Sequence, residues 1–316
     1  MNPELAFRQC EQITRSRATN FYYGIRLLPG PKRRALCAIY AFARRVDDIG
    51  DGPLPDGEKL LRLQAVRGSL DQLSPGSADP VLAGLGHTCT AFAIPREGLT
   101  DLIDGVEMDV RGATYDTFSD LETYCRRVAG SIGRLSVGVF GATDPSAMVL
   151  ADDLGVAMQI TNVLRDIRED LSRGRVYLPR EDLERFGCGP DLAASPSAAT
   201  GSLIRFEAGR ARAWFDRGLG LISMLDRRSA SCVVAMTGIY LRLLGQIEEK
   251  PDRVLRERLS LAPWEKAWVA ARSLSGAAVA SSRGVAMRPL YGSARGGGNG
   301  QAGRRRRVGS GTEVGR

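Results

Sequence analysis

Residues 151–174 read ADDLGVAMQITNVLRDIREDLSRG, and this stretch decides the fold class. Polar side chains recur in it at every fourth position, at Asn162, Asp166 and Asp170. Because residues four apart lie on the same face of an α-helix, these three side chains form a ladder along one helix. The rest of that face is small or apolar, so burying the carboxylates requires a cationic partner. The stretch therefore predicts a long helix that holds a cation.

A second acidic cluster, Asp47-Asp48-Ile49-Gly50-Asp51, ends the segment RRALCAIYAFARRVDDIGD (33–51). Apolar residues recur in this segment at helical spacing, which places Asp47 and Asp51 on one helix face. Three more stretches have helical patterns, at 121–141, 205–225 and 232–249. We find no sustained alternation of apolar and polar residues and no hairpin signal. The sequence therefore predicts one all-α domain over residues 1–274.

The formal net charge of +8 lies almost entirely in the last 42 residues. Residues 275–316 contain eight Arg and one Glu, a net charge of +7, which leaves 36 basic and 35 acidic residues in 1–274. Because this tail is rich in Gly and Arg and lacks apolar periodicity, we expect it to be disordered. The folded body is nearly neutral, so the charge does not indicate a nucleic-acid partner. The tail is either real or the product of a shifted reading frame in a GC-rich gene.

Several classes of protein lack support. No apolar run reaches about 18 residues, and the N-terminus MNPELAFRQCEQ has no apolar signal core, so we expect a cytoplasmic protein. The six cysteines are scattered without a C-x-x-C pair, which favours reduced thiols. The one histidine, His87, has no nucleophile or metal-ligand pattern beside it. Neither of the common glycine-rich nucleotide-binding motifs occurs.

The acidic clusters favour Mg²⁺, with Mn²⁺ as an alternative. Mg²⁺ prefers oxygen ligands and is often shared between one or two carboxylates and substrate phosphates. A solvated acidic face is the other interpretation of either cluster alone, but two such clusters on helices with apolar flanks favour the metal. Guanidinium groups, which match phosphate, accompany both clusters; of these we expect Arg168 and Arg173 to make intrahelical ion pairs. Together these features indicate an apolar diphosphate as substrate.

The chain resembles the squalene/phytoene synthase family in five segments, which occur in the family's order across nearly all of 15–270. They are NFYYGIRLLP (20–29), RRALCAIYAFARRVDDIGD (33–51), LIDGVEMD (102–109), YCRRVAGSIGRL (124–135) and LGVAMQITNVLRDIREDLSRGRVYLP (154–179). The resemblance implies an all-α isoprenoid-synthase bundle with a central apolar cavity. It also implies aspartates on opposite walls that hold Mg²⁺ and diphosphates, and head-to-head joining of two prenyl diphosphates.

The resemblance implies roles for particular residues. The metal ligands would be Asp47, Asp51, Asn162, Asp166 and Asp170, with Asp48 supporting the first pair. Arg44, Arg165 and Arg175 would hold diphosphate, and Tyr124 would lie near the reacting carbons. The cavity would be lined by Phe21, Tyr40, Gln159, Tyr177 and Tyr240, with core packing as the alternative for the aromatics. Asn20 stands where the family often has Ser, and its amide can still donate to a phosphate.

The implied reaction starts with departure of a diphosphate that the metal and the arginines stabilise. Aromatic faces and exclusion of water would protect the allylic cation. The double bond of the second substrate would attack this cation, and loss of a proton would close a cyclopropane. Released diphosphate and Tyr124 are both candidates to accept that proton.

Among family members, NFYYGIRLLP and RRVDDIGDG look most like bacterial presqualene diphosphate synthases of hopanoid biosynthesis. Those enzymes join two farnesyl diphosphates and need no NADPH, so we do not expect NADPH here. Phytoene synthase, which uses geranylgeranyl diphosphate, and squalene synthase are the alternatives. A lipid substrate and product leave peripheral association with the inner face of the membrane open, and the oligomeric state is unknown.

Two other classes of function remain open at this point. The first is a binding protein whose basic tail contacts nucleic acid or a membrane, a function that removal of 275–316 would abolish. An enzyme would keep its activity after the same truncation. The second is an all-α, Mg²⁺-dependent nucleotide pyrophosphatase, which uses helical acidic pairs but needs neither an apolar cavity nor Y-C-x-x-V-A-G. A nucleotide-release assay separates it from a prenyltransferase.

Overall fold

The computed structural model describes residues 2–18, 20–192 and 194–274, and these residues contain helices and loops but no strand. The α-helices are α1 (Pro3–Arg17), α2 (Phe21–Ile25), α3 (Gly30–Asp51), α4 (Asp56–Asp71), α5 (Pro80–Ala91), α6 (Glu97–Val110), α7 (Phe118–Cys125), α8 (Ser131–Phe140), α9 (Ser146–Ser172), α10 (Arg180–Arg185), α11 (Ser197–Gly218), α12 (Arg227–Glu249) and α13 (Pro263–Leu274). The predicted all-α class is confirmed. The predicted disordered tail, 275–316, lies outside the described residues, so the boundary at 274 stays a prediction.

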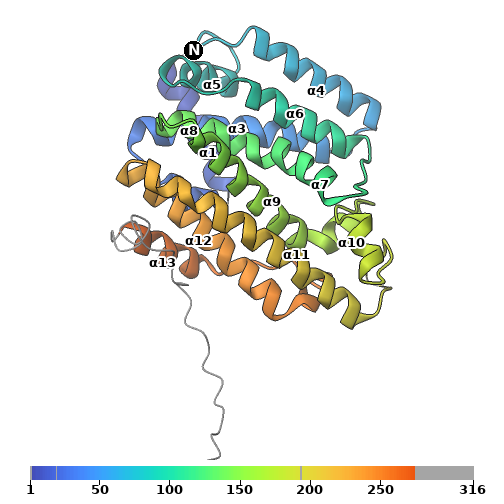
Figure 1. Cartoon of the computed structure of the whole chain (residues 1–316). Coiled ribbons are helices and arrows are strands. Elements are labelled where there is room, and N and C mark those ends of the chain that lie inside the picture. The colour runs from blue at the N-terminus through green and yellow to red at the C-terminus, as the bar shows by residue number, and fades with distance from the viewer. Residues whose placement is uncertain (1, 19, 193, 275–316) are drawn as a thin grey trace, which may run out of the picture.

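Helix α9 lies in the middle of the molecule (Figure 1). It packs against α8 on one side and against α11 and α12 on the other. From Ala151 to Leu164 all of its residues except Gln159 and Asn162 are buried, which explains why its apolar residues are not confined to one stripe. The ladder of Asn162, Asp166 and Asp170 therefore belongs to the central helix of the bundle.

Helix α3 faces α9 across the interior of the bundle. Pro31 occupies its first turn, where a missing backbone N–H costs nothing. Its buried face, which includes Leu36, Ile39 and Phe42, packs against α1, α5, α6 and α8. The helix continues to Asp51, so both Asp47 and Asp51 are held on regular helical backbone. This matches the end of the helix that the sequence predicted.

The predicted helix over 121–141 is divided into three parts. Between α7 and α8 lies a π-helical turn, η1 (Arg126–Gly130), within the YCRRVAG segment. Helix α9 crosses this turn at very short range. A Cβ atom on Gly155 of α9 would lie only 2.5 Å from the backbone nitrogen of Gly130. The buried Asp152 carboxylate of α9 binds both Arg126 and Arg134 there. The widened turn is thus held by a close backbone contact and two ion pairs.

Two short helices of 3₁₀ type complete the fold: η2 (Leu219–Met224) follows α11, and η3 (Pro251–Leu255) follows α12. Helices α9 and α12 are long and apolar enough to cross a membrane by length and composition alone. In their most apolar windows, 72% and 67% of residues are buried inside the molecule. That burial is typical of core helices, so this feature is weak support for a membrane span.

Side chains outside the acidic clusters agree with the sequence analysis. All six cysteines are free thiols, and all but Cys89 are buried. His87 packs against Phe7, with ring centroids 5.9 Å apart, and does not line the main cavity.

Candidate active site

A cavity of about 700 Å³ opens between α3, α6, α8, α9 and α12. Its volume is within the range of small-molecule sites, about 300–1,000 Å³. One part of its lining is apolar and includes Leu36, Ile39, Leu102, Val106, Val128, Phe140, Leu154, Leu221, Val233 and Met236. The other part is charged and includes Arg44, Asp47, Asp51, Asp109, Arg165, Asp166, Asp170, Arg173, Arg175 and Arg258. Such a cavity suits a ligand with a long apolar chain and an anionic head.

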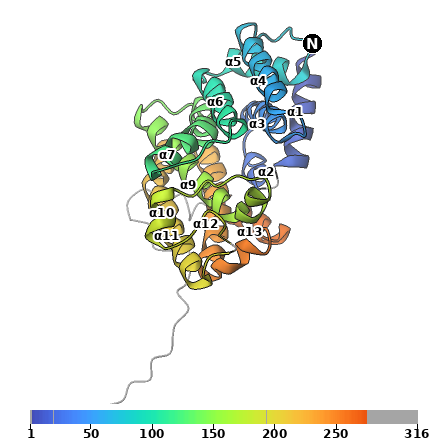
Figure 2. The ribbon, with the colours of Figure 1, turned by 90° about the vertical axis from the view of Figure 1, so that its right-hand side faces the viewer.

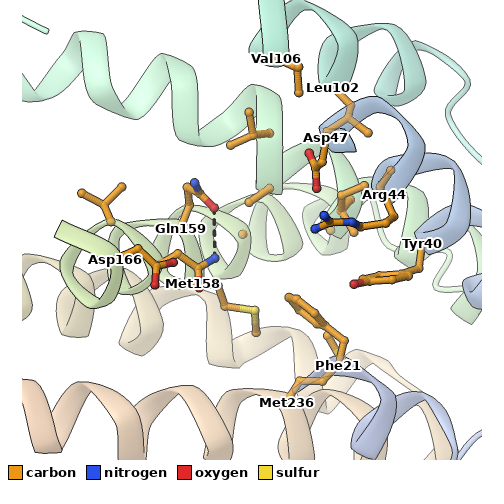
Figure 3. Close-up of a pocket in the computed structure, with 18 of the residues that line it drawn as sticks. Phe21, Tyr40, Arg44, Asp47, Leu102, Val106, Met158, Gln159, Asp166 and Met236 are labelled. Atoms are coloured by element: carbon orange, nitrogen blue, oxygen red, sulfur yellow. Dashed lines mark hydrogen bonds between the residues drawn. The ribbon is translucent and has the colours of Figure 1, made fainter. Parts of the chain in front are cut away.

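The two acidic clusters line this cavity from opposite walls. Asp47 and Asp51 come from α3, and Asp166 and Asp170 come from α9. Figure 3 shows Asp47 and Asp166 on opposite sides of the cavity, each pointing toward its interior. The spacing predicted each pair on one helix face, and the structure brings the two pairs to one site.

Arginines bind the carboxylates on both walls. Asp51 accepts hydrogen bonds from Arg173 at 3.1 Å and from Arg175 at 2.9 Å. Asp166 is bound by its neighbour Arg165 and by Arg258, whose Nε donates at 2.8 Å. Because these arginines lie beside the acidic groups in the same cavity, positive charge is available there for a diphosphate.

Arg173 and Arg168 depart from the sequence expectation in different ways. Arg173 makes the expected intrahelical pair with Glu169 at 3.2 Å, but it also reaches Asp51 across the cavity. Arg168 points away from the cavity lining and donates to the backbone carbonyl of Arg256. Arg258, from the loop before α13, was not predicted at all.

Burial raises the pKa of two of the aspartates, Asp47 and Asp170. The pKa of Asp47 is raised to about 7 by burial, against the opposing charge of Arg44 and with help from Asp51 and Asp109. The pKa of Asp170 is also raised to about 7 by burial and by Asp166, although Arg175 and Arg173 oppose the shift. Two carboxyl groups on facing walls thus carry a cost for ionisation that a cation would offset.

The chemistry of the polar side chains fits a hard divalent cation. The candidate metal ligands all offer carboxylate or amide oxygens. Among them, the buried Oδ1 of Asn162 accepts no hydrogen bond from a described residue. Its Nδ2 donates to Gln159 Oε1 at 3.2 Å, which leaves Oδ1 available as a ligand (Figure 3). Within 2–18, 20–192 and 194–274, no three His, Cys, Asp or Glu side chains form a ready metal cluster. Pairs of carboxylates suit Mg²⁺, which commonly completes its shell with waters and substrate phosphates.

A cluster of tyrosines surrounds the half-buried Asp109 carboxylate at one side of the cavity. The hydroxyls of Tyr124 and Tyr177 donate to the two oxygens of Asp109, at 2.9 and 2.8 Å. Their rings stack with centroids 5.2 Å apart, and Tyr115 packs against both. Burial raises the pKa of Tyr124 well above its ordinary value, and the charge of Asp109 adds to the shift. Tyr124 is therefore a neutral phenol that points its proton at Asp109.

The remaining aromatics form a second group around α2. Phe21 and Tyr40 line the cavity with ring centroids 6.4 Å apart (Figure 3). Tyr240 lies behind Phe21 at 5.7 Å and does not belong to the cavity lining. Burial raises the Tyr240 pKa, while the charge of Arg165 and hydrogen bonds that the amide groups of Asn162 and Asn20 donate to the Tyr240 oxygen oppose the shift. Tyr240 thus links three candidate site residues from outside the cavity.

Two further candidates, Asn20 and Asp48, also lie outside the cavity lining. Asp48 is half exposed and binds Arg44 one turn earlier on α3. Its position differs from the expectation that it belongs with the metal residues, because its side chain follows Asp47 by one residue and therefore points to another face of the helix. Asp48 holds Arg44, whose buried Nε donates to no described residue.

Residues 14–265 match the family described as squalene/phytoene synthase. The chain belongs to the squalene/phytoene synthase family. It is similar to a phytoene synthase of Mycobacterium tuberculosis, with 46% identity over 277 residues that cover 86% of this chain and 91% of the relative. A presqualene diphosphate synthase of Sinorhizobium fredii is 42% identical over 170 residues, 54% of this chain and 61% of that protein.

A solved structure shows the same architecture. A dehydrosqualene synthase crystallised in complex with a ligand superposes with a TM-score of 0.79, at 26% identity, over 86% of this chain and 96% of its own. The expected isoprenoid-synthase fold is thus confirmed. Members of this family are prenyltransferases that join prenyl diphosphates head to head.

Family membership explains why one cavity combines charged and apolar parts. The charged part lies where a diphosphate can meet carboxylates and arginines, and the apolar part can hold prenyl chains away from water. The sequence analysis missed Asp109, although it lies at the end of the quoted segment LIDGVEMD. A signal was present, because Asp109 follows the apolar residues Leu102 and Val106 at helical spacing and so shares their cavity-facing stripe.

Proposed function

We propose that this chain joins two molecules of geranylgeranyl diphosphate head to head to form phytoene. The observation that carries the choice of substrate is the similarity to phytoene synthases, which extends over 91% of the M. tuberculosis relative. Similarity to the presqualene diphosphate synthase covers only 61% of that protein.

The facing aspartates would hold Mg²⁺ together with the substrate diphosphates. Asp47 and Asp51 would contribute from α3, and Asn162, Asp166 and Asp170 from α9. When bound, Mg²⁺ supplies Lewis-acid stabilisation of the leaving diphosphate. Mn²⁺ could serve in the same place, because it also accepts oxygen ligands. The unused Nε of Arg44, together with Arg165 and Arg175, would bind the phosphate oxygens.

The apolar part of the cavity would protect the allylic cation. Phe21 and Tyr40 line the cavity, and aromatic ring faces attract cations. Leu102, Val106 and Met158 exclude water from the same space. Capture of the cation by the double bond of the second substrate, with loss of a proton, then closes the cyclopropane and leaves a cyclopropyl diphosphate. Departure of this second diphosphate, rearrangement of the resulting cation and loss of a second proton would give phytoene.

The tyrosine cluster bears on which group accepts that proton. Tyr124 already donates its hydroxyl proton to Asp109, and its raised pKa disfavours the phenolate form. A neutral phenol is a poor base, so the released diphosphate is the better acceptor. Tyr124 would instead orient the reacting carbons, with Tyr177 stacked behind it.

The second candidate is formation of presqualene diphosphate from two farnesyl diphosphates. The 42% identity with the S. fredii enzyme supports it, as does the resemblance of the segments 20–29 and 44–52. This alternative uses the same cavity, metal residues and arginines. Neither candidate requires NADPH, so we expect turnover without it.

Product analysis separates the two candidates. The purified protein is incubated with Mg²⁺ and either geranylgeranyl or farnesyl diphosphate, without NADPH, and the products are identified by mass spectrometry. We expect phytoene from the C20 substrate. Presqualene diphosphate from the C15 substrate, with no C40 product, would favour the second candidate, and no condensation with either substrate would refute both.

A further inference from the structure

The outer face of α13 is apolar. Its exposed positions are Pro263, Trp264, Ala267, Trp268, Ala271 and Arg272, which recur at helical spacing and form one stripe. Trp264 is 71% exposed and Trp268 is 44% exposed. A helix on a protein surface usually turns its apolar stripe inward, so an exposed stripe with two tryptophans indicates a partner.

The inner face of α13 already has its own packing partners. Val269 forms a small core cluster with Ile239 of α12 and Leu261, and Tyr23 of α2 packs against that cluster. The side chain of Lys266 is buried on this side as well. The helix is therefore anchored without help from Trp264, and the exposed tryptophans are not needed for the core.

Basic side chains surround the tryptophans. The guanidinium groups of Arg242 and Arg272 lie over the Trp268 ring, at 4.4 and 4.6 Å from its centroid. Arg227 and Arg228 are exposed at the start of α12, and Arg227 donates to the carbonyl of Leu274 at 3.4 Å. Residues 275–316, which lie outside the described residues, contain eight Arg and one Glu. Tryptophan beside arginine is typical of helices that lie in the interface of an anionic bilayer.

The position of α13 relates this surface to the cavity. Tyr23, which packs against the α13 cluster, belongs to α2, and the same short helix supplies Phe21 and Ile25 to the cavity lining. Figure 1 and Figure 2 both show α13 at the edge of the molecule, beside α12. One short helix thus separates the exposed tryptophans from the space in which we place the prenyl chains.

We propose that the outer face of α13 docks on an anionic phospholipid bilayer, with Trp264 and Trp268 inserted at the level of the headgroups. The surrounding arginines then lie against the lipid phosphates. The benefit of docking rests on the proposed function, because prenyl diphosphates and their condensation products partition into membranes. The contact itself rests on the stripe and its basic surroundings.

Vesicle sedimentation with the full chain tests the proposal. The vesicles contain equal parts phosphatidylglycerol and phosphatidylcholine, or phosphatidylcholine alone. We expect the wild-type protein to sediment with the anionic vesicles and the Trp264→Ala/Trp268→Ala variant to partition at least about tenfold more weakly. The Leu5→Ala/Leu61→Ala variant, which removes two exposed leucines from other helices, should bind as the wild type does. Two of the three tryptophans of the chain lie on this face, so wild-type tryptophan emission should also shift to the blue on binding.

Three results would overturn the proposal. They are no binding of the wild type to anionic vesicles, binding that the tryptophan substitutions leave unchanged, and a wild-type dimer that these substitutions convert to a monomer without effect on sedimentation. The second result would assign binding to the basic sequence alone, and the third would make the face a contact between copies. Turnover of detergent-dispersed substrate is measured in parallel, and we expect both variants to match the wild type. Absence of condensation by the wild type would refute the proposed function while leaving the sedimentation result to stand on its own.

Discussion

Among single residues, Asp47 connects the structure of the cavity with its chemistry most directly. It lies on the inner face of α3, where burial raises its pKa to about 7 despite the nearby Arg44. Asp170 has the same property on the facing wall. Each of these carboxyl groups lowers the stability of the folded protein when it is ionised without a cationic partner. Their presence in one cavity is understandable if a cation and its diphosphate normally share the site.

Removing one carboxylate from either wall should therefore stop turnover without unfolding the chain. We expect Asp47→Asn and Asp166→Asn each to lower turnover by at least about 100-fold, because the amide keeps the shape but loses the charge. Steady-state assays measure the loss, and circular dichroism checks the fold. Asp71→Asn, at the exposed end of α4, is the matched control and should retain activity. Turnover within twofold of wild type for both cavity variants would contradict the metal-site interpretation.

The raised pKa values also predict how Mg²⁺ and pH act on stability. Between an ordinary Asp pKa of about 4 and the raised values of about 7, the folded protein binds more protons than the unfolded chain. Stability from these groups therefore falls as pH rises through that window, and a bound cation should restore it. We expect Mg²⁺ to raise Tm more at pH 8 than at pH 5.5.

The Asp47→Asn/Asp170→Asn variant is the control for that measurement, since it lacks both titrating groups. Its Tm should respond weakly to Mg²⁺ at either pH. An equal rise in wild-type Tm at pH 5.5 and pH 8, measured by thermal unfolding, would show that these carboxyl groups are not where Mg²⁺ acts.

At the residue scale, the sequence predicted groups that recur and missed those that stand alone. Asp47 with Asp51, and Asp166 with Asp170, were found because a four-residue spacing marks one helix face. Asp109 has no such partner on its own helix, and its role depends on Tyr124 and Tyr177, which arrive from other segments. Arg258 was missed for the same reason, because it binds Asp166 from a loop 92 positions away.

At the scale of elements, the crossing of α9 with the π-helical turn fixes the shape of the cavity. Val128 and Ala129, from that turn, line the cavity together with Gly155 and Met158 of α9. A Cβ on Gly155 would lie 2.6 Å from the Ala129 carbonyl oxygen, closer than packed atoms allow. The two helices can approach this closely only because glycine occupies the contact.

Gly155→Ala should therefore destabilise the protein by about 1–3 kcal/mol, the usual cost of overpacking. Urea unfolding measures the difference in the free energy of unfolding. Gly209→Ala is the matched control, since a Cβ at this exposed position of helix α11 meets nothing within 4 Å. That control should be neutral or stabilising by up to about 1 kcal/mol, because alanine favours helix more than glycine does. Equal stability of the two variants would mean that α9 and the turn can separate freely.

The sequence predicted the long helices well and the π-helical turn not at all. Apolar periodicity and end signals such as Pro31 and Gly52 are local, so α3 could be delimited from them. The widened turn within YCRRVAG has no residue signature of its own, because it depends on the approach of Gly155 and on the pairing of Arg126 with Asp152. Tertiary contacts, and not local preference, determine that part of the backbone.

At the scale of the whole molecule, the facing of α3 and α9 converts two acidic pairs into one site. The pairs lie more than 100 positions apart, and their spacing predicts a face for each helix but no mutual orientation. That orientation was expected only from the resemblance to the squalene/phytoene synthase family, and the structure now shows both pairs on one cavity. The length of prenyl chain that the cavity accepts is likewise a property of many helices together.

Competition between the two prenyl substrates tests directly whether the protein condenses geranylgeranyl diphosphate in preference to farnesyl diphosphate. The wild-type protein is given Mg²⁺ and an equimolar mixture of geranylgeranyl and farnesyl diphosphate, without NADPH, and products are quantified by mass spectrometry. We expect phytoene to form in excess of C30 products by at least about tenfold. An excess of presqualene diphosphate, or release of diphosphate without any head-to-head product, would contradict it.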